Sequence, residues 1–231
     1  MTAFEFKQAR KGKRLTQQAV AKCLGVSQAY VALLEKGKRQ FPDALARKAV
    51  TRLQMNPLAL PFKEYTRNLS AQYLAQQFSS LGYPGFRSMR GAWKRNPVQV
   101  LLDALAQDNL EARLTEALPW LLTNYGNMSG TNRAWLVEQA RLRNLTNRLG
   151  FVVTLAKEVL SRSGETTSER YNSLVQLETE LKESRLDKEE TLCQSLLSMR
   201  EQQWLRETRP EAAAFWHLLT DWRPEHLQYG T

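Results

Sequence analysis

The stretch from Leu15 to Gly37, LTQQAVAKCLGVSQAYVALLEKG, constrains the fold of this chain most strongly. Thr16 suits the N-cap of a first helix, and Gly25 follows that helix at a place where the chain often needs a positive φ. Ser27 suits the N-cap of a second helix, which stops near Gly37. Apolar residues recur at helical spacing in both segments: Val20, Ala21, Leu24, Tyr30, Val31 and Leu34. The pattern therefore predicts two short helices joined by a tight turn.

A helix, a glycine turn and a capped helix make up the helix-turn-helix unit, whose second helix can lie in the major groove of DNA. The stretch LTQQAVAKCLGVSQAYVALLEKGKR resembles the Cro and phage-repressor type of this unit, often called the XRE family, and the likeness covers residues 4–54. The Thr-Gln start, the Leu-Gly-Val-Ser turn and the Leu-Glu-x-Gly-x-Arg end all fall at the spacing of that family. The resemblance implies a sequence-specific transcriptional repressor.

The resemblance also implies roles for individual side chains. Base contacts are implied for residues at the start of and along the second helix: Ser27, Gln28, Ala29 and Leu33. Contacts with the DNA backbone are implied for Gln17, which also braces the reading glutamine, and for Lys38 and Arg39. Gln28 is the principal reader, because its amide can pair with N6 and N7 of adenine. Leu33 departs from the polar residue common at its position, so it either touches a thymine methyl or packs inside.

The residues around this pair predict a domain of four or five helices. Phe4, Phe6 and Ala9 begin a first helix that packs behind the pair, and Pro42 suits the first position of a later helix. Tyr30 either packs partly inside or reaches DNA. The expected core consists of apolar residues from all these segments: Val20, Leu24, Val26, Val31, Leu34, Phe41, Val50 and Leu53.

Charge is unevenly distributed along the 231 residues. Residues 1–95 contain 18 Lys and Arg against 4 Asp and Glu, whereas residues 96–231 contain 15 against 19. Lys7, Arg10 and Arg14 are each expected to be solvated and, as a set, to attract a duplex, with Arg14 also taken as a phosphate contact. A basic front that coincides with a helix-turn-helix favours nucleic acid as partner, and the mildly acidic back suggests a second kind of partner.

Residues 57–96 are expected to connect two domains, 1–56 and 97–231. Two prolines in MNPLALPF end the first domain, and an amphipathic helix is predicted over residues 68–81. A turn at GYPG then leads to four basic residues around Trp93: Arg87, Arg90, Lys94 and Arg95. This stretch is either a basic arm that reaches DNA or a protein, or a solvated linker with Trp93 docked on the next domain.

Residues 97–231 are predicted to be helical throughout, which makes the whole chain all-α with a larger C-terminal helical domain. Helices are expected at about 97–107, 109–124, 131–144, 146–162, 166–184, 187–197, 199–208 and 210–220. Pro119 is expected to kink or split its helix. Capping boxes are expected at Thr166 with Glu169, Asp187 with Glu190 and Ser198 with Glu201. No segment alternates at period 2, so no sheet is predicted.

The sequence offers little support for catalysis, and we expect no enzyme, metal or cofactor. His217 and His226 have no companions at metal-ligand spacing. Asp187, Glu189 and Glu190 are interpreted as the acidic start of a helix. Both cysteines, Cys23 and Cys193, are interpreted as small core residues. No run of about 18 apolar residues could span a membrane, and the N-terminal residues lack the apolar core of a signal peptide, so we expect a cytoplasmic protein.

The order of a repressor-type domain and a long helical region resembles bacterial regulators encoded beside a toxin gene. Stretches such as LPWLL, NRLGFVV and ETLCQSLL carry this second resemblance. It implies an antitoxin that represses its own operon and neutralises a toxin, for which a nucleotidyltransferase-like protein is one candidate. Because one recognition helix reads only a few base pairs, we expect a homodimer on an inverted-repeat operator in double-stranded DNA. Two alternatives are a repressor that senses a small ligand and an enzyme acting on nucleic acid.

Overall fold

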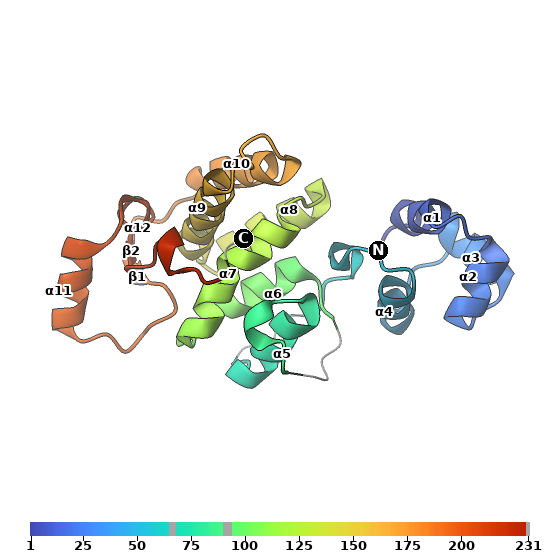
Figure 1. Cartoon of the computed structure of the whole chain (residues 1–231), viewed down its shortest axis with the longest axis horizontal. Helices are drawn as coiled ribbons and strands as arrows, with labels where there is room; N and C mark the ends of the chain where they lie inside the picture. The colour runs from blue at the N-terminus through green and yellow to red at the C-terminus, as the bar shows by residue number, and fades with distance from the viewer. Residues whose placement is uncertain (65–67, 90–93, 230–231) are drawn as a thin grey trace. The chain divides into compact units, whose positions relative to one another are not determined.

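The computed structural model describes residues 1–64, 68–89 and 94–229, and nearly all regular structure in them is helical (Figure 1). Contacts divide the chain into two compact units, Met1–Lys63 with Trp93–Asn96 and Glu64–Ala92 with Pro97–Thr231. The predicted all-α class, with a small N-terminal and a larger C-terminal helical part, is confirmed. The functional boundaries expected at residues 56 and 96 stay predictions, and Arg90 and Trp93 of the expected basic arm lie outside the described residues.

The first unit contains four α-helices and one 3-10 turn among its described residues: α1 (Ala3–Gly12), α2 (Gln17–Leu24), α3 (Gln28–Glu35), α4 (Asp43–Arg52) and η1 (Pro57–Ala59). A capping box begins α1, because Thr2 accepts from the Glu5 backbone N–H while the Glu5 carboxylate accepts from the Thr2 backbone N–H. Pro42 is the N-cap of α4 and not its first helical residue. This count agrees with the predicted four or five helices.

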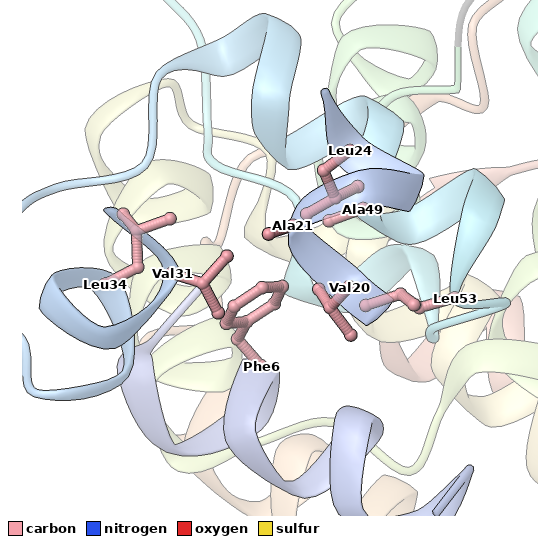
Figure 2. Close-up of a cluster of buried hydrophobic side chains, with 8 residues drawn as sticks. All are labelled: Phe6, Val20, Ala21, Leu24, Val31, Leu34, Ala49 and Leu53. Atoms are coloured by element: carbon pink, nitrogen blue, oxygen red, sulfur yellow. The ribbon is translucent and has the colours of Figure 1, made fainter. Parts of the chain in front are cut away.

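Apolar side chains from all four helices meet in one core (Figure 2). Its buried members are Phe6, Val20, Ala21, Leu24, Val31, Leu34, Ala49 and Leu53. Val50 is buried in an adjoining cluster, and Val26 and Phe41 are partly buried against the main one. Phe4 does not pack behind the helix pair as predicted, since it is 70% exposed. Phe6 alone anchors α1, because it lies on the inward face of that helix.

The second unit is a bundle around the long helix α9. Its helices within the described residues are α5 (Ala71–Leu81), η2 (Pro84–Phe86), α6 (Pro97–Leu105), α7 (Ala112–Tyr125), α8 (Gly130–Leu142), α9 (Thr146–Arg162), α10 (Glu169–Lys182), α11 (Met199–Thr208), α12 (Glu211–Phe215) and η3 (Pro224–His226). Helix α9 packs against α6, α7, α8, α10 and α12, and most of its side chains are buried. These contacts make α9 the central helix of the second unit.

Helix ends in the second unit follow local signals with some exceptions. The capping box of Ser198 with Glu201 is present at the start of α11. Helix α10 is capped by Ser168 and not by Thr166. Pro119 does not split its helix, because α7 continues through it.

The predicted helix over residues 187–197 is absent, and the prediction of no sheet is wrong in one small place. Residues Glu190–Thr191 form a short strand, β1, that pairs in parallel with β2 (Leu218–Leu219). The helix predicted to reach residue 220 therefore ends at Phe215, and His217 takes a positive φ of 52° before β2. Long-range pairing has overridden helical propensity in both segments.

Two side chains of α9 hold the segment before and within β1. Asn147 is fully buried; its amide donates to the Leu186 carbonyl (2.8 Å) and accepts from the Leu186 N–H (2.9 Å). The Arg148 guanidinium donates to Glu190 (3.1 Å) and to the Leu105 carbonyl (2.9 Å). Distant backbone groups and one carboxylate thus satisfy the polar atoms of these two side chains, as buried polar groups require.

The two cysteines differ in environment. Cys193 is buried, and burial raises the pKa of its thiol to about 11, which keeps it protonated near neutral pH. Cys23 is exposed on α2, so its interpretation as a core residue is wrong. Among the described residues, none of the helices combines the length and apolarity that crossing a bilayer requires.

Candidate nucleic-acid interface

The turn between α2 and α3 has the predicted local structure. The Thr16 hydroxyl accepts from the Ala19 N–H (3.1 Å), and the Ser27 hydroxyl accepts from the Tyr30 N–H (3.1 Å). Gly25 ends α2 in the left-handed region, with φ 71°, where a side chain would be strained. The glycine fixes where α2 ends, and the Ser27 cap fixes where α3 begins by satisfying a backbone N–H of its first turn.

The leading end of α3 faces solvent. Ser27, Gln28 and Ala29 are exposed, whereas Tyr30 and Leu33 are half-buried. Gln28 is the first residue of the helix, so its amide projects from the end that a helix-turn-helix domain inserts into the major groove. Leu33 is neither fully inside nor fully outside, which fits an apolar contact made from the edge of the core.

A buried carboxylate ties α3 to the two helices before it. Glu35 accepts from the Arg10 guanidinium, with Nη2 at 3.0 Å, and from the Gln17 amide at 2.9 Å. Arg10 also donates to the Leu15 carbonyl (2.8 Å). Burial of the Glu35 carboxyl acts to raise its pKa, but hydrogen bonds from Arg10 and Gln17 outweigh burial, and the net pKa is lowered. The same hydrogen bond to Glu35 raises the pKa of Arg10.

This network changes the interpretation of two predicted site residues and adds a third. Arg10 is not solvated as predicted, because its side chain is only 13% exposed and paired with Glu35. Gln17 has its amide nitrogen held by Glu35, which fixes its direction at the start of α2; its contact with phosphate stays a prediction. Sequence reasoning missed Glu35. The available signal was an acidic residue on the inward side of a strongly basic domain.

The remaining basic residues lie outside the network. Arg14, Lys36, Lys38 and Arg39 are exposed, and Arg14 takes a positive φ of 54° between α1 and α2. Residues 1–63 contain 13 Lys and Arg against 3 Asp and Glu. One of those three acids, Glu35, is neutralised by Arg10, so the surface around α3 is strongly positive and suited to a polyanion.

The acidic residues Asp187, Glu189 and Glu190 of the second unit do not start a helix, contrary to the prediction. Two of these carboxylates, Glu189 and Glu190, are instead paired with guanidinium groups. Glu189 accepts from Arg206 (2.8 Å) and Arg209 (2.9 Å), and Glu190 from Arg148. Within the described ranges, no three His, Cys, Asp or Glu side chains are placed to hold a metal ion.

The geometry of α2 and α3 defines a helix-turn-helix DNA-binding domain. Residues 6–59 match the helix-turn-helix family, of the XRE type, which is the family that the motif spacing suggested. No curated protein and no solved structure matches the chain significantly. On the strength of this match, which lies within the first unit, the chain is a DNA-binding transcriptional regulator.

Proposed function

We propose that the chain is a sequence-specific repressor that reads DNA with the leading end of α3. The exposed Gln28 directly follows the N-cap residue Ser27, and this position carries the proposal. An amide there can pair bidentately with adenine in the major groove. Ala29 and Leu33 would contact thymine methyl groups. Gln17, Lys38, Arg39 and Arg14 would hold phosphates, which sets the register of the helix on the duplex.

We further propose that the repressor binds as a homodimer to an inverted repeat in the cytoplasm, without catalysing a reaction. Footprinting on the DNA upstream of its own gene tests this proposal. Two protected half-sites of opposite orientation, with centres about 34 Å or one duplex turn apart, are the expected result. Protection of no fragment above the level of random DNA would refute the repressor.

We propose that the second unit binds a protein partner, a toxin encoded beside this gene, for which a nucleotidyltransferase-like protein is one candidate. Leu196, Met199 and Trp204 are 86%, 77% and 53% exposed, and Leu205 is the only buried residue of α11. In Figure 1, α11 lies at the edge of the second unit, next to α12 and β2. Large exposed apolar side chains close in sequence are typical of interaction sites.

Capture of the neighbouring gene product tests the antitoxin proposal. The co-expressed toxin should be retained by the wild-type chain and lost with Trp204→Ala, because a partly exposed aromatic side chain is a frequent anchor of protein interfaces. Gln203→Ala on the same helix is the matched control. Equal capture by both variants would exclude Trp204 as a contact, and no capture by the wild-type chain would refute the antitoxin role.

A second candidate function is a repressor that senses a small ligand. An open hollow of about 570 Å³ in the second unit favours it, with Asp108, Arg143, Arg148 and Glu190 among its lining residues. Such a mixture of charges suits a polar ligand that carries both signs of charge. A thermal shift with small polar metabolites, together with no capture of a neighbouring gene product, would favour this function over the antitoxin.

A further inference from the structure

A chain segment from beyond the family match returns to the DNA-binding unit. Asn96 is fully buried, and its amide donates to the carbonyls of Leu58 and Leu60, each at 2.9 Å. These carbonyls belong to η1 and the residue after it, at the end of the matched segment. The two bonds fix residues 94–96 on the first unit, although 30 or more residues of sequence separate them from it.

The returning segment adds positive charge beside α4. Lys94 and Arg95 line one small hollow together with Arg47 and Lys63, and the acid among its lining residues is Asp43. Asp43 lies 3.2 Å from the Lys63 ammonium and 3.8 Å from the Arg47 guanidinium. Four cations against one carboxylate leave this surface strongly positive.

This positive surface adjoins the loop that follows α3. Pro61 lines the hollow with Lys94 and Arg95, and it also lines a neighbouring hollow with Gly37 and Arg39. The second hollow is formed partly by the loop that follows α3, in which Lys38 and Arg39 are expected to contact phosphates. We use the name flanking basic surface for five residues: Arg39, Arg47, Lys63, Lys94 and Arg95.

We propose that the flanking basic surface binds the sugar-phosphate backbone of the duplex next to the segment read by α3. The proposal rests on the repressor function above and adds a contact from Lys63, Lys94 and Arg95, which lie outside residues 6–59. DNA backbone is the ligand that suits it, because the surface adjoins the loop beside α3 and the described residues that line its hollow have a positive net charge. Contacts to phosphates strengthen binding through counterion release and carry no base specificity.

Salt dependence of DNA binding tests this contact. The double variant Lys94→Gln/Arg95→Gln removes two charges, and Lys188→Gln/Arg200→Gln removes two exposed charges from the second unit as a matched control. The probe is a random-sequence duplex of about 30 base pairs, titrated at several salt concentrations. The slope of log Kobs against log salt should fall by about 1–2 per bound subunit in the first variant, with about 10-fold weaker binding near 0.1 M salt. The control should keep the wild-type slope.

Two outcomes separate this proposal from the repressor function. Equal slopes for the two double variants would overturn the flanking contact, whatever the sequence preference of the protein. A wild-type chain without sequence preference would refute the repressor instead. A lowered slope with unchanged base preference is the result that supports the proposal, and an unchanged thermal melting curve of Lys94→Gln/Arg95→Gln excludes unfolding as its cause.

Discussion

Gln28 is the residue on which the proposed recognition of DNA bases depends most. Its side chain is exposed at the first position of α3, and truncation removes the amide without disturbing a packed group. We expect Gln28→Ala to weaken specific binding by about 1–3 kcal/mol, because one bidentate base contact is lost. Binding to random DNA should be nearly unchanged. Titration of the footprinted fragment and of a random duplex measures both quantities.

Gln8→Ala is the matched control for this measurement. Gln8 is an exposed glutamine of the same unit, but it lies on α1 and not on the helix pair. Its replacement should leave both affinities unchanged. A wild-type footprint in the Gln28→Ala variant would remove Gln28 from the set of base-reading residues.

Glu35 holds the recognition helix in place through two other helices. The Glu35 side chain is only 3% exposed, and Glu35→Gln would break its buried ion pair with Arg10. Removal of one partner of a buried pair costs about 3 kcal/mol, because the remaining charge loses its compensation. Amide hydrogen exchange of α1, α2 and α3 should accelerate, while exchange in the second unit stays unchanged. Glu64→Gln, at an exposed acid, is the control.

The same carboxylate gives the first unit a pH-dependent stability. The pKa of Glu35 is lower in the folded protein than the ordinary value of 4.5, so its contribution is complete above that value and is lost as pH falls through the lowered pKa. Hydrogen exchange in α1–α3 of the wild type should therefore lose protection as the pH falls below 4.5 and through the lowered pKa of Glu35. The Glu35→Gln variant should lack this component, and identical pH profiles in the two proteins would contradict the assignment.

The residues of the interface divide into those that sequence can place and those that it cannot. Thr16, Gly25 and Ser27 act on backbone within three or four positions, so their roles follow from local spacing. Arg10 and Glu35 are 25 positions apart and meet only after α1 and α3 pack together. A pattern of helical spacing does not show which residues of two different helices meet, so it cannot predict that Arg10 pairs with Glu35 and leaves solvent.

Among the helices, α9 makes one close contact with Trp216, the residue that follows α12. A Cβ on Gly150 would lie 2.4–2.5 Å from three ring atoms of Trp216, which is fully buried and donates from Nε1 to the Thr154 hydroxyl (2.9 Å). Gly150→Ala should destabilise the second unit by about 2 kcal/mol, because the rigid ring must move although alanine favours the helix. Denaturant unfolding followed by tryptophan fluorescence measures the change.

Gly130→Ala is the control for this contact. Gly130 is the first residue of α8 and has no atom within 4 Å of an added Cβ. That substitution should be neutral or stabilise by up to about 1 kcal/mol, since alanine is the better helix former. Equal stabilities of the two alanine variants would show that Trp216 adapts to the added methyl group.

The helices and strands also divide into those that the local sequence predicts and those that it does not. Helices α2 and α3 were predictable because apolar periodicity and N-capping residues agree in both, and α9 was predictable from its apolar residues alone. The segment 187–197 contains helix-forming residues, yet Arg148 binds Glu190 and Cys193 takes a positive φ of 56°. Hydrogen bonds to residues far away in the sequence determine the structure of this segment, and the local sequence does not predict them.

At the scale of the whole molecule, the distribution of charge separates two tasks. The strongly positive part of the chain ends near residue 95, and the remainder carries four more acids than bases. A phosphate backbone attracts the first part and does not attract the second. The second unit is therefore better suited to binding a protein or a small molecule than to enlarging the DNA contact. In the proposed homodimer, it would affect repression through the arrangement of the two DNA-binding units.

That arrangement makes binding depend on the spacing of the operator. If two α3 helices of a homodimer read half-sites about one turn apart, five additional base pairs place the half-sites on opposite faces of the duplex. Affinity should then fall towards that of a single half-site, and insertion of about ten base pairs should restore part of it by returning both half-sites to one face. Gel shifts with the three spacings measure this periodicity. Equal binding to all three would mean that each chain reads DNA alone, in which case the second unit does not couple two recognition helices.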